Sequence, residues 1–275
     1  MDTMKEDAIK AIVDTAISSF ANGLDTKHTS EVDNPDGVIN SKKNNIFIAE
    51  LGSEFMFYSA FVRSFDSSFG KVLENMSNNI EKLSYEVKDK IYGYILPQQQ
   101  QQIDYMMDSY LRRDQPKISQ YVDFIWITPR DTRSYETSHC TDNFFYDRLN
   151  DIYYLIELKA GGDLDNKKAK SEKVALLNEY FILKNHLIEE GIQNPNIKIF
   201  LATAYNKNGE GNTFKNDRVR QFFSNDELLI GRDYWNFVCN DPNGFDIVMC
   251  QYKKSADYIK SALQKVKKLY FGENI

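Results

Sequence analysis

One segment of the chain, residues 151–162, joins an apolar strand pattern to a pair of opposite charges. Residues 152–156 read Ile-Tyr-Tyr-Leu-Ile, and such β-branched and aromatic runs are typical of a buried strand. Glu157 and Lys159 follow, and side chains two residues apart on a strand share one face. An acid and an amine at the end of an apolar strand are costly unless they bind something, so this pair predicts a functional site.

A second strand is predicted upstream over residues 121–127, where Asp123 is the one acid among apolar residues. If the two strands are neighbours, Asp123 and Glu157 meet, with Lys159 beside them. Two carboxylates that share a site repel each other unless a cation neutralises them, and Mg²⁺ accepts carboxylate oxygens while it also binds water and phosphate. A nearby amine can orient or activate an attacking water. The pattern therefore predicts a site that cleaves phosphodiester bonds.

The acid-x-lysine triplet is not specific by itself, because it also occurs at residues 25–27, 86–88 and 165–167. The alternative interpretation of such a triplet is a solvated pair of opposite charges. None of the other three copies follows an apolar strand, whereas Glu157 and Lys159 do. The strand context therefore favours a catalytic role for this copy.

Asp123 followed by Glu157-Leu158-Lys159 resembles the PD-(D/E)XK nuclease signature, with Val122 in the place of the usual proline. More specifically, over roughly residues 55–260 the chain resembles the TdeIII-type family of type II restriction endonucleases. The segments that carry this resemblance are Val-Asp-Phe at 122–124, Tyr-Leu-Ile-Glu-Leu-Lys at 154–159, the lysine-rich helix start that follows, Ala-Thr-Ala-Tyr-Asn at 202–206, and Glu-Leu-Leu-Ile-Gly-Arg-Asp-Tyr-Trp-Asn-Phe at 227–237. The connection at 131–149 is longer than the resemblance implies.

The resemblance implies an α/β fold with a PD-(D/E)XK core, in which a mixed central sheet is flanked by helices and preceded by a helical N-terminal region. It implies a type II restriction endonuclease that hydrolyses double-stranded DNA with Mg²⁺ at a GGNCC-like palindrome and leaves 5′-phosphates. Asp123 and Glu157 would hold the metal with the Leu158 carbonyl, and Lys159 would orient or activate the water. Glu74 would add a further acid to the metal site, although a surface glutamate is the alternative interpretation.

A palindromic target is most simply read by a two-fold dimer, so a homodimer is expected, together with a cognate DNA methyltransferase as functional partner. Two basic segments are expected to contact DNA, one in the helix start after residue 162 and one in a Gly- and Asn-rich loop at 205–216 and just beyond it. Solvated basic surface is the alternative. The candidate DNA-binding residues are Lys167, Lys168, Lys170, Lys207, Lys215, Arg218 and Arg220.

The chain has 275 residues, of which 42% are hydrophobic, enough for a sizeable core. We expect a single nuclease domain with a mainly helical part at 1–115, a catalytic α/β core at 116–205 that ends in a third buried strand, and a DNA-contacting and helical part at 206–275. The polar N-terminus and the absence of a long apolar run or a Cys-x-x-Cys spacing favour a reduced, cytoplasmic protein. The net charge of −6 does not exclude DNA, because affinity depends on where cations lie.

Two alternatives stay open at this point. One is another PD-(D/E)XK nuclease, such as a repair or structure-specific enzyme, which would share the core but not the sequence readout. The other is a non-catalytic DNA-binding protein in which Asp123, Glu157 and Lys159 form only a buried ion cluster. Metal-dependent cleavage would separate the second alternative from the enzymes, and a discrete pattern of plasmid fragments would identify a restriction enzyme.

Overall fold

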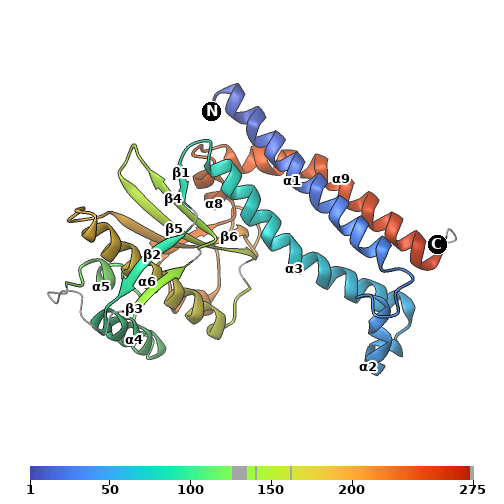
Figure 1. Cartoon of the computed structure of the whole chain (residues 1–275), viewed down its shortest axis with the longest axis horizontal. Coiled ribbons are helices and arrows are strands. Elements are labelled where there is room, and N and C mark those ends of the chain that lie inside the picture. Colours follow the sequence, from blue (N-terminus) through green and yellow to red (C-terminus); the bar gives the residue numbers. More distant parts are fainter. Residues whose placement is uncertain (89, 126–134, 140, 162, 273–275) are drawn as a thin grey trace. The chain divides into compact units, whose positions relative to one another are not determined.

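The structure is a computed structural model that describes residues 1–88, 90–125, 135–139, 141–161 and 163–272. The chain divides into two compact units, one formed by Met1–Asn79 with Asp246–Ile275 and the other by Ile80–Phe245 (Figure 1). The single nuclease domain with internal boundaries at 115 and 205, which the sequence suggested, stays a prediction. The α/β class and the helical N-terminal region are confirmed, because the first unit is helical and the second contains a mixed sheet.

Long helices build the described part of the first unit, which contains all of α1 and most of α3 and α9. Their bounds are α1 (Thr3–Ser30), α3 (Ser53–Glu81) and α9 (Gly244–Phe271). Two short elements, η1 (Asn40–Asn44) and α2 (Ile46–Ala49), lie between α1 and α3 in the chain.

Apolar side chains at helical spacing build the core of the first unit. Phe20 and Leu24 of α1 are buried together with Phe57 and Phe61 of α3 and with Val266 of α9. A stripe with steps of three and four residues is the pattern that a helix needs in order to bury one face. Burial of this stripe therefore accounts for the packing of these helix segments into one unit.

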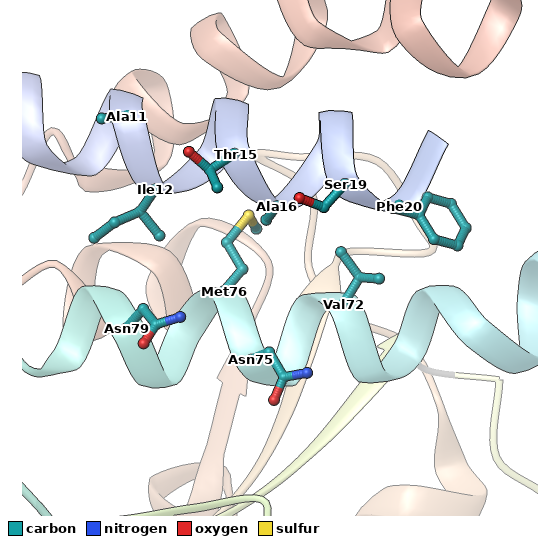
Figure 2. A pocket seen from close by; sticks show the side chains of 10 residues that line it. All are labelled: Ala11, Ile12, Thr15, Ala16, Ser19, Phe20, Val72, Asn75, Met76 and Asn79. Atoms are coloured by element: carbon teal, nitrogen blue, oxygen red, sulfur yellow. The ribbon is translucent and has the colours of Figure 1, made fainter. Parts of the chain in front are cut away.

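An open groove of about 530 Å³ lies between α1 and α3 in the first unit (Figure 2). Met76 of α3 points toward α1, where Ala16 and Thr15 leave room for it. The residues that line the groove are Ala11, Ile12, Thr15, Ala16, Ser19, Phe20, Val72, Asn75, Met76 and Asn79. Because these side chains are apolar or uncharged, the groove offers no group for acid–base chemistry.

The second unit is built on a five-stranded mixed sheet with the strand order β1-β4-β5-β6-β7. The strands are β1 (Glu86–Lys88), β4 (Asn143–Asp147), β5 (Ile152–Gly161), β6 (Ile197–Tyr205) and β7 (Leu228–Ile230). The β1, β4 and β5 strands are antiparallel neighbours, whereas β5, β6 and β7 run parallel. The predicted strand at 152–156 and the third buried strand predicted at the end of the core are therefore confirmed as β5 and β6.

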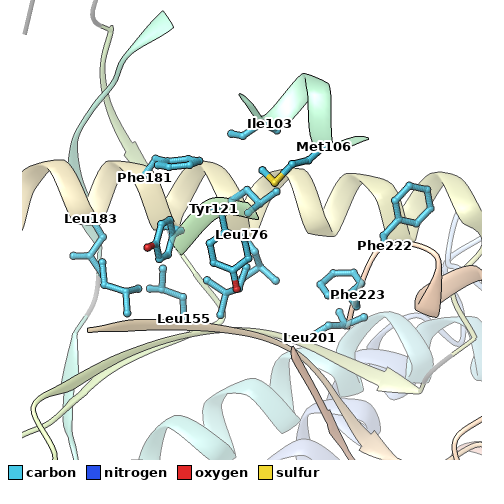
Figure 3. Packing of buried hydrophobic residues seen from close by; sticks show 14 of the residues in the cluster. Ile103, Met106, Tyr121, Leu155, Leu176, Phe181, Leu183, Leu201, Phe222 and Phe223 are labelled. Atoms are coloured by element: carbon cyan, nitrogen blue, oxygen red, sulfur yellow. The ribbon is translucent and has the colours of Figure 1, made fainter. Parts of the chain in front are cut away.

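Helix α6 (Asn166–Glu189) links the parallel strands β5 and β6 and packs on the sheet. Figure 3 shows Leu176 of α6 in one cluster with Leu155 of β5 and Leu201 of β6, and all three side chains are fully buried or nearly so. A parallel pair of strands needs such a crossover, and the helix then covers one face of the sheet.

The remaining elements of the second unit surround this core. A two-stranded sheet pairs β2 (Ile91–Ile95) with β3 (Tyr135–His139). The helices are α4 (Pro97–Leu111), α5 (Ser119–Val122), α7 (Asp217–Arg220), η2 (Asn225–Glu227) and α8 (Arg232–Val238).

The predicted strand at 121–127 is wrong in its described part. Tyr121 and Val122 end the short helix α5, Asp123 is its C-cap, and residues 126–127 lie outside the described residues. Tyr121 is buried, but Val122 is 40% exposed and Ile125 is 81% exposed. The apolar composition of this run therefore does not reflect a strand that is buried in the sheet.

A buried ion pair joins α6 to the segment ahead of β7. Lys173 is in direct contact with the Glu227 carboxylate, and both side chains are almost inaccessible to solvent. Glu227 also accepts hydrogen bonds from the Tyr121 hydroxyl at 2.9 Å and from the backbone and side chain of Ser224. Burial lowers the pKa of Lys173, and the Glu227 charge opposes this effect. Every member of the network is thus paired.

We predict that Lys173→Met destabilises the second unit by about 3–5 kcal/mol, because it leaves a carboxylate buried without its counterion. Adding Glu227→Gln should recover much of this loss, since the glutamine side chain keeps an acceptor for Tyr121. Urea unfolding of both variants measures the effect. Lys260→Met, which removes an exposed pair with Asp257, serves as control and should change little. Equal stability of Lys173→Met and the wild type would contradict the prediction.

Candidate active site

Strand β5 carries the predicted pair, and the strand beside it supplies a second acid. Asn143, the first residue of β4, pairs with Ile156 of β5. Asp142 directly precedes this pair, and its Oδ2 accepts a hydrogen bond from the backbone N–H of Leu158 at 3.0 Å. The carboxylate of Asp142 therefore lies at the same end of β5 as Glu157 and Lys159.

Lys159 is held between two carboxylates. Its Nζ is in direct contact with Oε1 of Glu157 and lies 3.3 Å from Oε1 of Glu172, which belongs to the second turn of α6. The Lys159 side chain is 27% exposed and that of Glu157 14%. The group is thus neither sealed from solvent nor freely hydrated, as expected for a site that must admit a substrate.

The electrostatics of the site favour binding of further positive charge. Burial raises the pKa of Glu157, and the negative charge of Asp142 raises it further, whereas Lys159 acts in the opposite direction. Burial alone would lower the pKa of Lys159, but Glu157, Glu172 and Asp142 outweigh it and raise the pKa. Lys159 is therefore cationic at neutral pH, and the carboxylates around it are not fully neutralised.

Helix α6 contributes two acids that the sequence interpretation missed. Glu172 and Glu179 are seven residues apart and therefore lie on one face of the helix. Burial raises the pKa of Glu179 to about 8; Thr141 opposes this rise, and the charges of Glu157, Asp142 and Glu172 add to it. Its Oε2 has no hydrogen-bond partner among the described residues. The signal in the sequence is the seven-residue spacing of two glutamates after the acid-x-lysine strand, and the lysines in the same turns obscure it.

A buried glutamate fixes the start of β4. Oε2 of Glu81 accepts a hydrogen bond from Nδ2 of Asn143 at 3.2 Å, and the Tyr234 hydroxyl donates to Oδ1 of the same asparagine at 3.2 Å. Glu81 is fully buried, and this burial raises its pKa to about 8. Because Asn143 directly follows Asp142, this network sets where the Asp142 backbone enters the sheet.

The donor set fits a hard divalent cation, although the acids are not arranged as a complete metal cage. Within the described residues, no group of three or more His, Cys, Asp or Glu side chains is placed to hold a metal ion. Asp142 and Glu157 are close enough to share a proton, and their oxygens are the ligands that Mg²⁺ prefers. A cation with only a few protein ligands that keeps its waters suits two carboxylates of this kind.

Asp123 lies in a different environment from the one expected for it. It is exposed at the end of α5, and its charge acts on Tyr180 and Lys184. The strand that was expected to bring it beside Glu157 is absent from residues 121–125, and Asp142 takes that place next to Glu157. Glu74, the further candidate, belongs to α3 in the first unit, so its participation stays a prediction.

The candidate DNA contacts differ in how free they are to bind. Lys167 and Lys168 are exposed in the first turn of α6, where Asp165 caps the helix by accepting from the Lys168 backbone at 2.8 Å. Lys170 is half-buried. Lys207 lies 3.2 Å from Asp163, which is itself highly exposed. The lysines at the start of α6 are therefore available to a ligand in solvent.

The loop at 206–216 is held by its own hydrogen bonds instead of being loosely structured. Asn206 donates to the Asn212 carbonyl at 2.7 Å, and Glu210 accepts from the backbone N–H groups of Asn206 and Arg232. A side chain at Gly231, which has a φ of +54°, would collide with the Glu210 carboxylate. The loop is thus joined to the start of α8.

The cations of this loop region separate into bound and exposed groups. The Arg220 guanidinium donates to the Phe214 carbonyl at 2.8 Å and therefore supports the loop from within. Lys215 and Arg218 are exposed. Neither of these two cations forms an ion pair with the residues that the structure describes, so no such pair would have to be broken there on binding.

Two acids and a lysine gathered where β4 and β5 pair are groups that can support metal-assisted hydrolysis of a phosphodiester. The HinfI type II restriction endonuclease family model matches residues 5–256, and the chain belongs to this family. It is therefore a site-specific deoxyribonuclease. No curated protein and no solved structure gives a significant match. The family found is the HinfI family, so the narrower TdeIII-type resemblance stays a prediction.

No helix in the described part of the chain is long and apolar enough to cross a membrane.

We predict that Glu81→Gln changes the pH dependence of stability. Wild-type Glu81 keeps its proton up to about pH 8 when folded but loses it near 4.5 when unfolded, so stability falls as pH rises through this interval. The variant lacks that fall, and its stability relative to the wild type should increase by up to about 1.4 kcal/mol per pH unit.

Urea unfolding at pH 5, 6, 7 and 8 tests this prediction. Glu86→Gln is the matched control, because hydrogen bonds from Lys88 and Arg148 lower the pKa of the Glu86 carboxyl. If the Glu81→Gln and wild-type profiles stay parallel, Glu81 does not titrate as a buried carboxyl.

Proposed function

We propose that this endonuclease hydrolyses double-stranded DNA with Mg²⁺ at Asp142, Glu157 and Lys159, and that it leaves 5′-phosphates. The observation that carries the proposal is the position of Asp142, bonded to the Leu158 backbone at the end of β5 where Glu157 and Lys159 lie. Asp142 replaces Asp123 as the partner of Glu157 in this assignment.

Asp142 and Glu157 would hold the metal, together with the Leu158 backbone carbonyl that the sequence comparison suggested. Bound there, Mg²⁺ would polarise the phosphate and lower the pKa of a bound water. The two carboxylates have different supports, because Asp142 accepts from the Leu158 backbone whereas Glu157 contacts Lys159. Because the two acids are held by different contacts, both would stay in place when phosphate approaches.

Lys159 would orient the attacking water as an ammonium donor. Its pKa is raised by the surrounding acids, so it carries a proton that it can donate to a water or phosphate oxygen. Glu172 supports this role, since its carboxylate lies 3.3 Å from the Lys159 nitrogen and limits where the amine can point. Glu172 is therefore a positioning residue in this proposal.

The DNA duplex would contact the lysines at the start of α6 and the exposed loop cations. Lys167 and Lys168 are exposed and would neutralise phosphates, while Lys215 and Arg218 extend from a loop whose backbone is fixed by Asn206 and Glu210. A fixed loop supports base reading better than a mobile one, because less conformational entropy is lost on binding.

The target is proposed to be a palindrome that a homodimer reads, with a cognate methyltransferase protecting the same sequence in the cytoplasm. The GGNCC-like form of the target depends on the TdeIII-type resemblance alone. Family membership favours a restriction enzyme over the repair-type and non-catalytic alternatives. Digestion of a mapped plasmid with Mg²⁺, followed by sequencing of the ends, tests target, cut position and 5′-phosphate together.

We predict that Lys159→Ala slows cleavage by ~10²–10⁴-fold while DNA binding in Ca²⁺ stays near the wild-type level, because the amine acts on the water. Single-turnover cleavage and a binding titration measure the two quantities separately. Lys88→Ala, which removes a lysine of β1 paired with Glu86, is the control for loss of a positive charge. Wild-type cleavage by Lys159→Ala would refute the assignment.

We predict that Asp142→Asn and Glu157→Gln each lose divalent-ion binding, because each change removes an anionic ligand at similar size. Asp123→Asn is the matched control and should keep the affinity, since Asp123 is exposed and acts on Lys184 instead. Calorimetric titration of Ca²⁺ in the presence of DNA gives the affinities. Loss of binding in Asp123→Asn but not in Asp142→Asn would restore the assignment that the sequence suggested.

A further inference from the structure

A tyrosine at the end of β6 lies over the end of β5, next to the candidate active site. Tyr205 pairs with Gly161 in the parallel register between these two strands. Gly161 follows Lys159 by two residues, so both positions belong to the same face of the sheet. A Cβ atom added at Gly161 would lie 2.3 Å from the Tyr205 hydroxyl oxygen and 2.6 Å from Cζ of its ring. The phenol ring therefore occupies the space that a side chain at residue 161 would need.

Hydrogen bonds fix the backbone that carries this tyrosine. The carbonyl of the preceding residue accepts from Nε1 of the buried Trp235 at 2.9 Å, and the Thr203 hydroxyl donates to the Tyr205 carbonyl at 3.0 Å. The next backbone N–H, that of Asn206, donates to the Glu210 carboxylate at 2.7 Å. A side chain on such a backbone loses little conformational freedom when it binds a ligand.

The side chain of Tyr205, in contrast, is open to solvent. It is 53% exposed, and its hydroxyl makes no hydrogen bond with the residues that the structure describes. Two buried tyrosines of the second unit are paired, since Tyr121 donates to Glu227 and Tyr234 donates to Asn143. Tyr205 thus offers a donor for which no contact with the described residues has to be broken before a ligand binds.

The edge of the sheet that carries Tyr205 is also where a DNA backbone would pass. The carboxyl ends of the parallel strands β5 and β6 meet there, and ligands of open α/β sheets bind outside such an edge. Beyond the paired residues, Lys207 lies 3.2 Å from Asp163, so the segments after the two strands stay side by side. Lys167 and Lys168 are exposed at the start of α6, which follows β5 in the chain.

We propose that the Tyr205 hydroxyl donates a hydrogen bond to a phosphate oxygen of the cleaved DNA strand, within two nucleotides of the cleaved bond. Tyrosine is among the side chains that bind phosphate oxygens and thereby position a protein on DNA. Gly161 lies about 6.6 Å beyond Lys159 along the strand. Successive phosphates of one DNA strand advance by about 3.4 Å along the helix axis, which gives the stated range. The inference rests on the proposed function, because Lys159 marks where the cleaved phosphate lies.

Gly161 has a defined part in this arrangement. An alanine there would displace the far end of the Tyr205 side chain, which can rotate, and would not collide with backbone atoms first. The missing side chain at residue 161 therefore allows the hydroxyl to lie over the end of β5. Replacing the glycine and replacing the tyrosine should remove the same contact, so their effects should not add.

Tyr205→Phe tests the donor, because it keeps the ring over Gly161 and removes only the hydroxyl. Single-turnover cleavage at enzyme concentrations below saturation should be about 10–100-fold slower, the loss expected for one hydrogen bond to a charged oxygen. The affinity for Ca²⁺ without DNA should not change. Tyr92→Phe is the matched control, since Tyr92 of β2 is 57% exposed, and this variant should cleave at the wild-type rate. Wild-type cleavage by Tyr205→Phe would overturn the inference.

Duplexes with a single uncharged methylphosphonate in place of one phosphate locate the contact. At one position within two nucleotides of the cleaved bond, the advantage of the wild type over Tyr205→Phe should disappear, because the acceptor is altered in both cases. A purely structural effect of the substitution would slow the variant by the same factor on every duplex. That result would also overturn the inference.

Gly161→Ala tests whether the position of the ring matters. It should slow the otherwise wild-type enzyme about as much as Tyr205→Ala does, and it should have little effect when added to Tyr205→Ala. Gly70→Ala is the control, because a Cβ atom there meets nothing within 4 Å. Additive effects of Gly161→Ala and Tyr205→Ala would contradict the inference.

Failure of this contact and failure of the proposed function give different results. A slow Lys159→Ala variant with a wild-type rate for Tyr205→Phe would refute the contact alone. Wild-type cleavage by Lys159→Ala would refute the proposed site, and the methylphosphonate series would still decide whether Tyr205 binds a phosphate near the cleaved bond.

Discussion

The candidate site depends on an imbalance of charge at the end of β5, where one ammonium group faces several carboxylates. Lys159 contacts Glu157 and Glu172, and Asp142 acts on both Glu157 and Lys159. Burial makes this imbalance expensive, because carboxylates removed from water raise their pKa unless a cation stabilises the charged form. The divalent cation proposed above would supply the missing positive charge and at the same time bind phosphate.

The register between β4 and β5 decides which acids take part. Asn143 pairs with Ile156, so the residue before β4 is brought to the Leu158 backbone, and that residue is Asp142. A shift of one residue would turn the side chains of β4 to the opposite face of the sheet. The side-chain amide of Asn143 donates to Glu81 and accepts from the Tyr234 hydroxyl. These two hydrogen bonds stabilise the register between β4 and β5 on which the site depends.

The β5 half of the site could be predicted from sequence because its signal is local. The apolar run at 152–156 and the pair Glu157 and Lys159 belong to one strand, and periodicity identifies a strand of that kind. The other half could not be identified in this way. Asp142 lies in a connection that appears polar, and its place beside Glu157 comes from antiparallel pairing with β5, which is a tertiary contact. Asp123 was chosen because it interrupts an apolar run, but apolar composition does not report burial, and Ile125 in that run is mostly exposed.

Two lysines of the second unit show how a structural ion pair differs from a candidate catalytic one. Lys173 is sealed against Glu227, whose carboxylate is fully occupied by Tyr121 and Ser224, so each charge has its partners and nothing further is required. Lys159 is partly open, and its acids outnumber it. Both lysines contact a glutamate directly, so the contact alone does not distinguish them. Solvent access and unmatched charge do distinguish them, because a ligand binds only at a site that it can enter and whose charge is not already balanced.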